Sequence, residues 1–293
     1  MTKIKGVFPV LITPMTADEE VDYEGFKKNI EHFIAQGAAG ITVVGSTGEF
    51  VSLTTEERYK LVEVAVEQVA GRVPVIAGTA AERTADAIKH TQHAEKAGAD
   101  ASLLINSYYA HPKEHEIYEH FKAVAESVKF PIMIYNNPFV SGVDISAETM
   151  LQVAKDVDNI THIKESSGDI GKARDIARAG KDFVEVFCGS EDLALESKFV
   201  GATGWISVSA NIVPSVTKEL YDAYDNGDLE RAWALYDKLL PLCKFLEGSG
   251  KYVQIVKRAM DLQGLAGGPA RKPRLGLTEE EETTLKELLA SFE

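Results

Sequence analysis

Lys164 is the residue whose surroundings most clearly indicate chemistry. It ends a short apolar segment, Ile160–Lys164, and is followed by the turn Ser166-Ser167-Gly168-Asp169. An ammonium group held among apolar neighbours at a strand end loses solvation, which favours a neutral, nucleophilic amine. Most lysines at strand ends simply extend into solvent. Lys164 is therefore a candidate nucleophile only if other reactive residues gather around it.

The segments that would position Lys164 alternate between short apolar runs and longer amphipathic runs. The apolar runs have the length and the Val/Ile content of strands, and they cover residues 6–13, 40–44, 73–77, 101–105, 131–135, 160–164, 184–188 and 204–208. The runs between them have helical spacing, and one begins with a predicted capping box of Thr54 and Glu57. Gly98, Gly180 and Gly201 stand where a left-handed cap would end a helix. The pattern is a βα unit repeated eight times.

Eight apolar strands joined by crossover helices predict an α/β fold, a (β/α)8 TIM barrel. A doubly wound open sheet is the alternative, but Thr13-Pro14-Met15 stands where that fold carries a G-x-G-x-x-G turn. From about residue 213 onward, helices are expected over 215–226, 228–246, 252–263 and 278–292. We therefore expect a barrel over residues 1–226. A C-terminal helical extension over 227–293 should pack on it, because no flexible linker intervenes.

In a TIM barrel the loops after the strands converge at one end and hold the active site. Reactive residue types follow four other predicted strands, in the motifs Gly45-Ser46-Thr47-Gly48-Glu49, Ser107-Tyr108-Tyr109, Tyr135-Asn136-Asn137-Pro138 and Gly189-Ser190-Glu191-Asp192. The backbone N–H groups around Ser46 and Thr47 can hold a carboxylate. Each motif also has a plain structural interpretation, as a turn, a packed aromatic residue or a charge at a helix start.

Three of these motifs together resemble the dihydrodipicolinate synthase and N-acetylneuraminate lyase family of Schiff-base-forming enzymes. They are Gly45–Glu49, Tyr135–Pro138 and Lys164 within Ile-Lys-Glu, and the likeness continues through Gly201–Ser207 and the helical tail. The resemblance implies that Lys164 attacks the ketone of pyruvate or another 2-oxo acid and forms an imine. It also implies that this covalent imine replaces any cofactor and that no metal is bound.

The resemblance further implies a role for each matching residue. Tyr135 would shuttle protons during imine formation, and Thr47 would join that relay. Ser46 and Thr47 would bind the carboxylate of the 2-oxo acid. Tyr109 would reach the relay of a neighbouring subunit across a tight dimer, and the backbone carbonyl of Ile206 would line the pyruvate pocket.

The predicted site for the second substrate departs from the synthases of the family. Val140 stands where those synthases usually carry an arginine that binds a second carboxylate, and an apolar side chain cannot replace a guanidinium. The acidic pair Glu191-Asp192 resembles the pair that binds sugar hydroxyls in the sialate lyases. Val208 and Ser190 differ from the residues of those lyases. The residues expected to line this part of the site are Val140, Ser166, Glu191 and Asp192.

The function predicted from these residues is that of a class I lyase acting on a 2-oxo acid. It would cleave or form an aldol bond with pyruvate, or dehydrate a 2-keto-3-deoxy sugar acid. The alternatives within the family are a 4-hydroxy-tetrahydrodipicolinate synthase with an atypical carboxylate site, an N-acetylneuraminate lyase and a pyrroline-4-hydroxy-2-carboxylate deaminase. Outside it stand an inactive barrel that senses a 2-oxo acid and a metal-dependent class II aldolase. For the latter, the histidines lack carboxylate partners at ligand spacing.

The composition limits the partners and the location. With 45% hydrophobic and 26% charged residues the chain has a globular composition, and its net charge of -14 argues against binding nucleic acid. Cys188 and Cys243 offer no disulfide framework, which suits a reducing compartment. No signal-peptide layout and no apolar run of about 20 residues is present, so we expect a cytoplasmic protein without a membrane partner. The family resemblance implies a homotetramer, built as a dimer of dimers.

Overall fold

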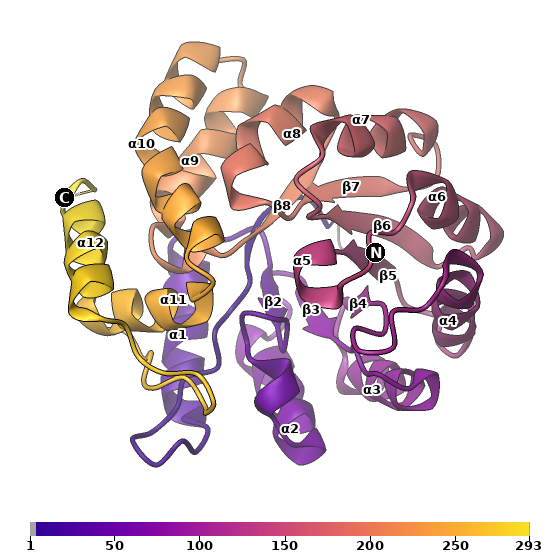
Figure 1. The fold of residues 1–293 in the computed structure, drawn as a ribbon, viewed down its shortest axis with the longest axis horizontal. Helices are drawn as coiled ribbons and strands as arrows, with labels where there is room; N and C mark the ends of the chain where they lie inside the picture. The colour runs from indigo at the N-terminus through magenta and orange to yellow at the C-terminus, as the bar shows by residue number, and fades with distance from the viewer. Residues whose placement is uncertain (1–3, 293) are drawn as a thin grey trace.

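A ring of eight parallel strands, surrounded by helices, forms the centre of the computed structural model, which describes residues 4–292 (Figure 1). The expected barrel, residues 1–226, includes residues 1–3, and the expected helical extension, 227–293, includes residue 293. These four residues lie outside the described part of the chain. The strands are β1 (Gly6–Pro9), β2 (Ile41–Val43), β3 (Val75–Gly78), β4 (Ala101–Ile105), β5 (Ile132–Asn136), β6 (Ile160–Glu165), β7 (Glu185–Cys188) and β8 (Gly204–Ser207).

The order of the strands closes the ring. Each strand from β2 to β7 pairs in parallel with the next one along the chain, and β8 pairs with β1. An isolated parallel bridge between Val10 and Thr42 joins the chain after β1 to β2, where Leu11 N donates a hydrogen bond to Thr42 O at 2.8 Å. The predicted (β/α)8 TIM barrel is confirmed, and the open sheet is excluded.

Helices cover the outer face of the barrel, and shorter ones lie in the loops after the strands. The covering helices are α1 (Tyr23–Ala35), α2 (Thr55–Val69), α3 (Thr84–Ala97), α4 (Glu114–Glu126), α6 (Ala147–Asp156), α7 (Ile170–Ala179), α8 (Ala194–Val200) and α9 (Pro214–Asp225). The loop helices are α5 (Pro138–Ser141) and the 3-10 helices η1 (Phe50–Ser52), η2 (Glu191–Leu193) and η3 (Ser209–Asn211).

Local sequence explains where several helices begin and end. Thr54 and Glu57 form the predicted capping box of α2. Gly98 and Gly201 end α3 and α8 with φ of 95° and 113°, in the left-handed region that a residue without Cβ adopts at little cost. Gly180 ends α7 with φ of -92°, so the prediction of a left-handed cap was wrong there.

The barrel interior is filled by aromatic rings below the level of the site. Phe8 and Phe187 pack edge to face, with ring centroids 5.7 Å apart. Gly40 and Gly204 leave the space that these rings occupy, because a Cβ would lie 1.9 Å from a Phe8 carbon and 2.2 Å from a Phe187 carbon. This packing leaves the opposite end of the barrel for a cavity.

Three C-terminal helices, α10 (Leu229–Gly248), α11 (Tyr252–Leu262) and α12 (Glu279–Ala290), gather on one side of the ring (Figure 1, orange to yellow). The chain between α11 and α12 returns to the loop after β2, where Arg271 makes two 2.7 Å hydrogen bonds to the carboxylate of Glu57 and one to Ser52 O. The division into two regions at residue 226 stays a prediction. Within residues 4–292, no helix combines the length and the apolar character needed to cross a membrane.

Candidate active site

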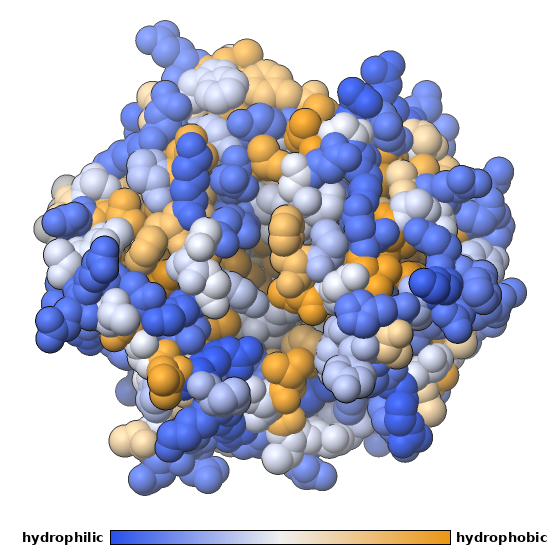
Figure 2. Space-filling model, viewed as in Figure 1, coloured by the Kyte–Doolittle hydropathy of each residue, from blue (hydrophilic) through white to orange (hydrophobic). Residues whose placement is uncertain are grey.

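A cavity of about 450 Å³ lies at the C-terminal ends of the strands. Most residues predicted for the site line it, namely Ser46, Thr47, Tyr135, Val140, Lys164, Ser166, Glu191 and Asp192. Helix α5, which carries Val140, lies in front of the strands near the middle of the ring (Figure 1). On the same face, pale and orange side chains gather near the middle, and blue side chains predominate toward the edge (Figure 2). The cavity thus collects residues from loops that are far apart in the sequence.

Lys164 and Tyr135 are neighbours on adjacent strands. They are register partners in the β5–β6 pair, so their side chains leave the sheet on the same side. The Lys164 amine lies 4.1 Å from the centroid of the Tyr135 ring, and Lys164 is only 4% exposed. Among the described residues, no carboxylate forms an ion pair with it. The amine is therefore held inside the cavity and does not extend into solvent as an ordinary strand-end lysine would.

The Tyr135 hydroxyl is oriented by the residue two positions further on. Asn137 Nδ2 donates a hydrogen bond to Tyr135 Oη at 2.8 Å. This bond uses the oxygen as an acceptor and leaves the phenolic proton free to be donated. Tyr135 can therefore give a proton to a group that is bound beside Lys164.

Gly189, at the end of β7, makes room for the reactive lysine. A Cβ at this position would lie 1.8 Å from Ser166 Oγ and 2.6 Å from Lys164 Cε. The Ser166 hydroxyl is buried and has no hydrogen-bond partner among the described residues. A buried hydroxyl without a partner is costly. This one lines the cavity, where a ligand can satisfy it.

The loop that carries Ser46 and Thr47 has an unusual backbone. Val44, which precedes it, has φ of 56°, although a β-branched residue rarely adopts the left-handed region. Gly78 on β3 permits this conformation, because a Cβ there would lie 2.1 Å from Val44 O. Strained backbone of this kind persists only where the surrounding structure holds it, and it is common at functional sites.

Glu191 lines the cavity, and its carboxylate is bound by neighbouring groups of the protein. Its carboxylate accepts hydrogen bonds from Val208 N (2.6 Å), Ser209 N (2.9 Å), Ser209 Oγ (2.6 Å) and Ser207 Oγ (3.2 Å), all in the chain after β8 or at its end. Burial raises the pKa of its carboxyl group to about 7. Both oxygens thus accept hydrogen bonds within the protein, and binding of a substrate hydroxyl by Glu191 stays a prediction. Asp192 lines the same cavity, and no hydrogen bond from another described residue reaches its carboxylate.

Two predicted residues lie outside the cavity. Tyr109 is 84% exposed in the loop after β4, so its side chain serves no group of its own chain's cavity. Its role in a partner's site stays a prediction. Ile206 is fully buried within β8, and Val208 lines the cavity two residues further on; a pocket role for the Ile206 backbone carbonyl stays a prediction.

The C-terminal helices contribute residues that the sequence analysis missed. Glu247 and Leu246 from α10 and Tyr252 from α11 line the cavity beside Lys164. Glu247 Oε1 accepts a hydrogen bond from Glu191 N at 2.8 Å, and burial raises the pKa of its carboxyl group even though the residue is exposed at the cavity mouth. The break Gly248-Ser249-Gly250 between two helices was the signal in the sequence that could have indicated a loop near the site.

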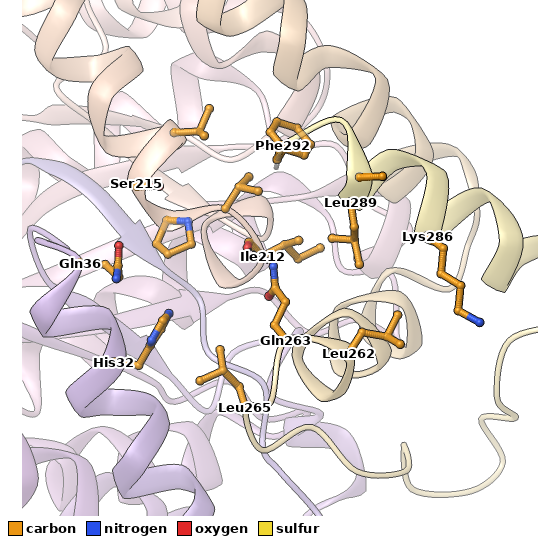
Figure 3. A pocket seen from close by; sticks show the side chains of 14 residues that line it. His32, Gln36, Ile212, Ser215, Leu262, Gln263, Leu265, Lys286, Leu289 and Phe292 are labelled. Atoms are coloured by element: carbon orange, nitrogen blue, oxygen red, sulfur yellow. Dashed lines mark hydrogen bonds between the residues drawn. The ribbon is translucent and has the colours of Figure 1, made fainter.

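A second cavity, of about 630 Å³, lies on the flank between α1, the start of α9, α11 and α12 (Figure 3). Gln263 spans it by donating a hydrogen bond to Ile212 O at 2.9 Å, and Leu289 and Phe292 close its side toward α12. It contains none of the residues predicted to do chemistry. The chemistry therefore belongs to the cavity around Lys164.

Comparison with known proteins shows similarity over the whole chain. The model of the dihydrodipicolinate synthetase family matches residues 3–292. A 4-hydroxy-tetrahydrodipicolinate synthase of Methanothrix thermoacetophila is 39% identical, covering 98% of this chain and 97% of the relative. The enzyme of the same name from Methanococcoides burtonii is 40% identical, covering 97% of each.

Solved structures agree with this result. A putative dihydrodipicolinate synthetase from Pseudomonas aeruginosa matches with a TM-score of 0.96 and 36% identity, covering 99% of this chain and all of that one. A prophage protein of E. coli K12, described as a member of the dihydrodipicolinic acid synthase family in complex with pyruvate, matches with a TM-score of 0.94 and 31% identity, covering 98% of each chain.

Proposed function

The chain belongs to the dihydrodipicolinate synthetase family, and from this premise we propose that it is a lyase that binds a 2-oxo acid, with pyruvate as the first candidate, as an imine on Lys164. The observation that carries the proposal is the buried amine of Lys164, 4.1 Å from the centroid of the Tyr135 ring. The similar prophage protein of E. coli K12 was solved in complex with pyruvate, which supports the choice of substrate.

The proposed reaction begins with attack of the Lys164 amine on the C2 carbonyl. Tyr135 donates a proton to the carbonyl oxygen, which leaves as water when the imine forms. Tyr135, left as a phenolate by that donation, takes a proton from C3 while the protonated imine accepts the electron pair of the C3–H bond, and this gives an enamine. C3 then attacks an aldehyde and forms the new carbon–carbon bond, Tyr135 returns the proton to the aldehyde oxygen, and water releases the product from Lys164. Ser46 and Thr47 hold the carboxylate of the 2-oxo acid throughout, and no cofactor is required.

We propose a hydroxylated, uncharged aldehyde as the second substrate, so that the product is a 2-keto-3-deoxy sugar acid. Val140 supplies no charge, and Lys164 is the one Lys, Arg or His side chain among the described residues that line the cavity. Asp192 offers free acceptors for hydroxyl groups. Dehydration of the same sugar acid starts from the same imine and is the second reaction open to this site.

A 4-hydroxy-tetrahydrodipicolinate synthase is the other candidate, and the names of the curated relatives favour it. Its product carries two carboxylates, of which pyruvate supplies one, so the aldehyde must bring the other. Incubation of the enzyme and pyruvate with either glyceraldehyde or aspartate semialdehyde separates the two candidates. Faster loss of pyruvate with aspartate semialdehyde would select the synthase.

Borohydride reduction tests the shared step. Wild-type protein incubated with pyruvate and borohydride should gain the mass of one reduced pyruvate on Lys164, as located by peptide mass spectrometry. The Lys164→Arg variant retains the charge but forms no imine, and it should gain nothing. An adduct on another residue would overturn the mechanism, and so would wild-type protein without any adduct. Binding of pyruvate without turnover of any aldehyde would instead indicate a sensing barrel.

Assembly is also a proposal. We infer a homotetramer formed as a dimer of dimers, in which Tyr109 of one subunit reaches the site of the next. The 84% exposure of Tyr109 in the single chain supports this proposal, because the side chain is available to a partner.

A further inference from the structure

Glu247 lies where the C-terminal helices meet the cavity. It stands near the end of α10, immediately before the break that leads to α11. The hydrogen bond from Glu191 N to Glu247 Oε1 fixes the carboxylate against the start of η2, next in the chain to Asp192. Among the described residues, no hydrogen bond reaches Glu247 Oε2. One oxygen thus anchors the side chain, and the other is free toward the cavity.

The charged side chains that line the cavity differ in how deeply they are buried. Lys164 is 4% exposed and lies inside, whereas Glu247 is exposed at the mouth. Asp192 is half-buried and carries the other free carboxylate of the lining. An aldehyde that enters therefore meets two carboxylates, and Lys164, the one basic side chain of the described lining, is neutral in the enamine that would attack it.

We propose that Glu247 is a specificity-determining residue, which with Asp192 accepts hydrogen bonds from the hydroxyl groups of an uncharged aldehyde and repels an aldehyde that carries a carboxylate. The inference rests on the proposed function, because it concerns the second substrate of the Lys164 imine. A carboxylate oxygen accepts hydrogen bonds from hydroxyl groups and cannot donate to a second carboxylate. Like charges brought close at a cavity mouth also repel, which discriminates against the wrong partner.

The structure also explains why this residue comes from the tail. The wall formed by η2 presents Glu191, whose oxygens are already occupied by the chain after β8. A free acceptor on this side of the cavity must therefore come from Asp192 or from a neighbouring element. Helix α10 supplies it through Glu247.

The test compares two aldehydes with pyruvate as the common partner. Glyceraldehyde is uncharged and hydroxylated, and succinic semialdehyde carries a carboxylate. The measured quantity is the ratio of kcat/KM for glyceraldehyde to kcat/KM for succinic semialdehyde, at saturating pyruvate. In wild-type enzyme the ratio should favour glyceraldehyde. Glu247→Arg should lower the ratio by about tenfold or more, because it replaces repulsion of the carboxylate by attraction.

Glu247→Gln should lower the ratio in the same direction by a smaller factor. The amide oxygen of the glutamine can still accept the hydrogen bond from Glu191 N. The glutamine variant therefore tests the role of Glu247 if the arginine variant fails to fold. Glu230→Gln is the matched control, since Glu230 is an exposed glutamate in the first turn of the same helix, and it should leave the ratio unchanged.

The outcomes separate the inference from the proposed function. A wild-type enzyme without a borohydride adduct on Lys164 would overturn the proposed function. A normal adduct in all variants, with ratios in Glu247→Gln and Glu247→Arg within about twofold of wild type, would overturn only the role of Glu247. A wild-type preference for succinic semialdehyde would overturn that role as well.

Discussion

Glu49 and Lys257 form an ion pair 2.5 Å long that is closed to solvent, with exposed fractions of 0% and 1%. Glu49 ends the motif that carries Ser46 and Thr47, and Lys257 lies in α11. Arg271 N donates a further hydrogen bond to Glu49 Oε2 at 2.9 Å, and Lys257 donates to Pro269 O at 2.7 Å. The loop of Ser46 and Thr47, which we propose to bind the carboxylate, is thus held to the C-terminal region by a contact buried from solvent.

Replacing Lys257 by methionine should destabilise the protein strongly. The change removes the closer counter-ion of the buried Glu49 carboxylate and leaves it with Arg274 Nη1 at 3.6 Å, and removing one partner of a buried pair costs about 3–5 kcal/mol. Urea unfolding at neutral pH measures the effect. Lys286→Met, which breaks an exposed pair with Glu282, should cost less than about 1 kcal/mol. Equal losses of unfolding free energy in the two variants would show that the buried pair stabilises the protein no more than the exposed pair does.

Tyr135→Phe should lower kcat for aldol turnover by about 10²–10⁴-fold, because it removes the proton donor while keeping the ring. The stability of the variant should change little. Tyr118→Phe on the outer helix α4 is the control, since the Tyr118 hydroxyl donates its hydrogen bond to Asp156, away from the cavity. An unchanged kcat in Tyr135→Phe would assign the proton transfer to another group.

Gly189→Ala should slow imine formation with pyruvate far more than it lowers stability. The added Cβ would meet Ser166 Oγ and Lys164 Cε, so the lysine must move from its place beside Tyr135. The rate of borohydride-trapped adduct formation measures this. Gly276→Ala is the control, because a Cβ there meets nothing within 4 Å. This variant should form the borohydride-trapped adduct at the wild-type rate. Adding Ser166→Ala to Gly189→Ala should recover part of the rate, and no recovery would argue against the steric explanation.

Glu191 should make the protein less stable as the pH rises from 4.5 to 7. Its pKa is about 7 in the folded chain and near the ordinary 4.5 when unfolded, so over this interval the folded state binds more protons than the unfolded state. The contribution lost is of the order of 3 kcal/mol. Other carboxyl groups titrate in the same interval, so the informative quantity is the difference between wild type and Glu191→Gln. The variant should lose less stability than wild type between pH 4.5 and 7, and parallel curves would refute the shifted pKa.

Mixing two defective subunits should test the shared site at Tyr109. Tyr109→Phe removes the expected relay residue, and Lys164→Arg removes the nucleophile. If Tyr109 serves a partner's site, a mixed oligomer contains some sites with both an intact lysine and an intact tyrosine. Activity should therefore rise after the two variants are unfolded and refolded together, with light scattering to follow assembly. No gain over the separate variants would place Tyr109 outside the relay.

The sequence predicted the barrel well because its signals are local. Apolar runs and capping boxes such as that of Thr54 and Glu57 depend on neighbours in the chain, and β4 was predicted with its observed bounds. Lys164 and Tyr135 were found because both stand at strand ends, where the fold brings them together. Glu247 was missed because its closeness to Lys164 depends on how α10 docks. The contacts of Glu191 with Ser207 and Ser209 could not be predicted, because these serines follow it by 16 and 18 residues and give no local signal of the contact.

The ion pair between Glu49 and Lys257 makes the loop of Ser46 and Thr47 depend on helix α11. During synthesis, the loop with Ser46 and Thr47 emerges long before Lys257 and Arg271. Until those residues arrive, Glu49 has no counter-ion and the cavity lacks its wall from α10 and α11. A nascent or truncated barrel therefore holds Lys164 in an unfinished cavity, and we expect the proposed carboxylate binding to develop only after α11 has docked.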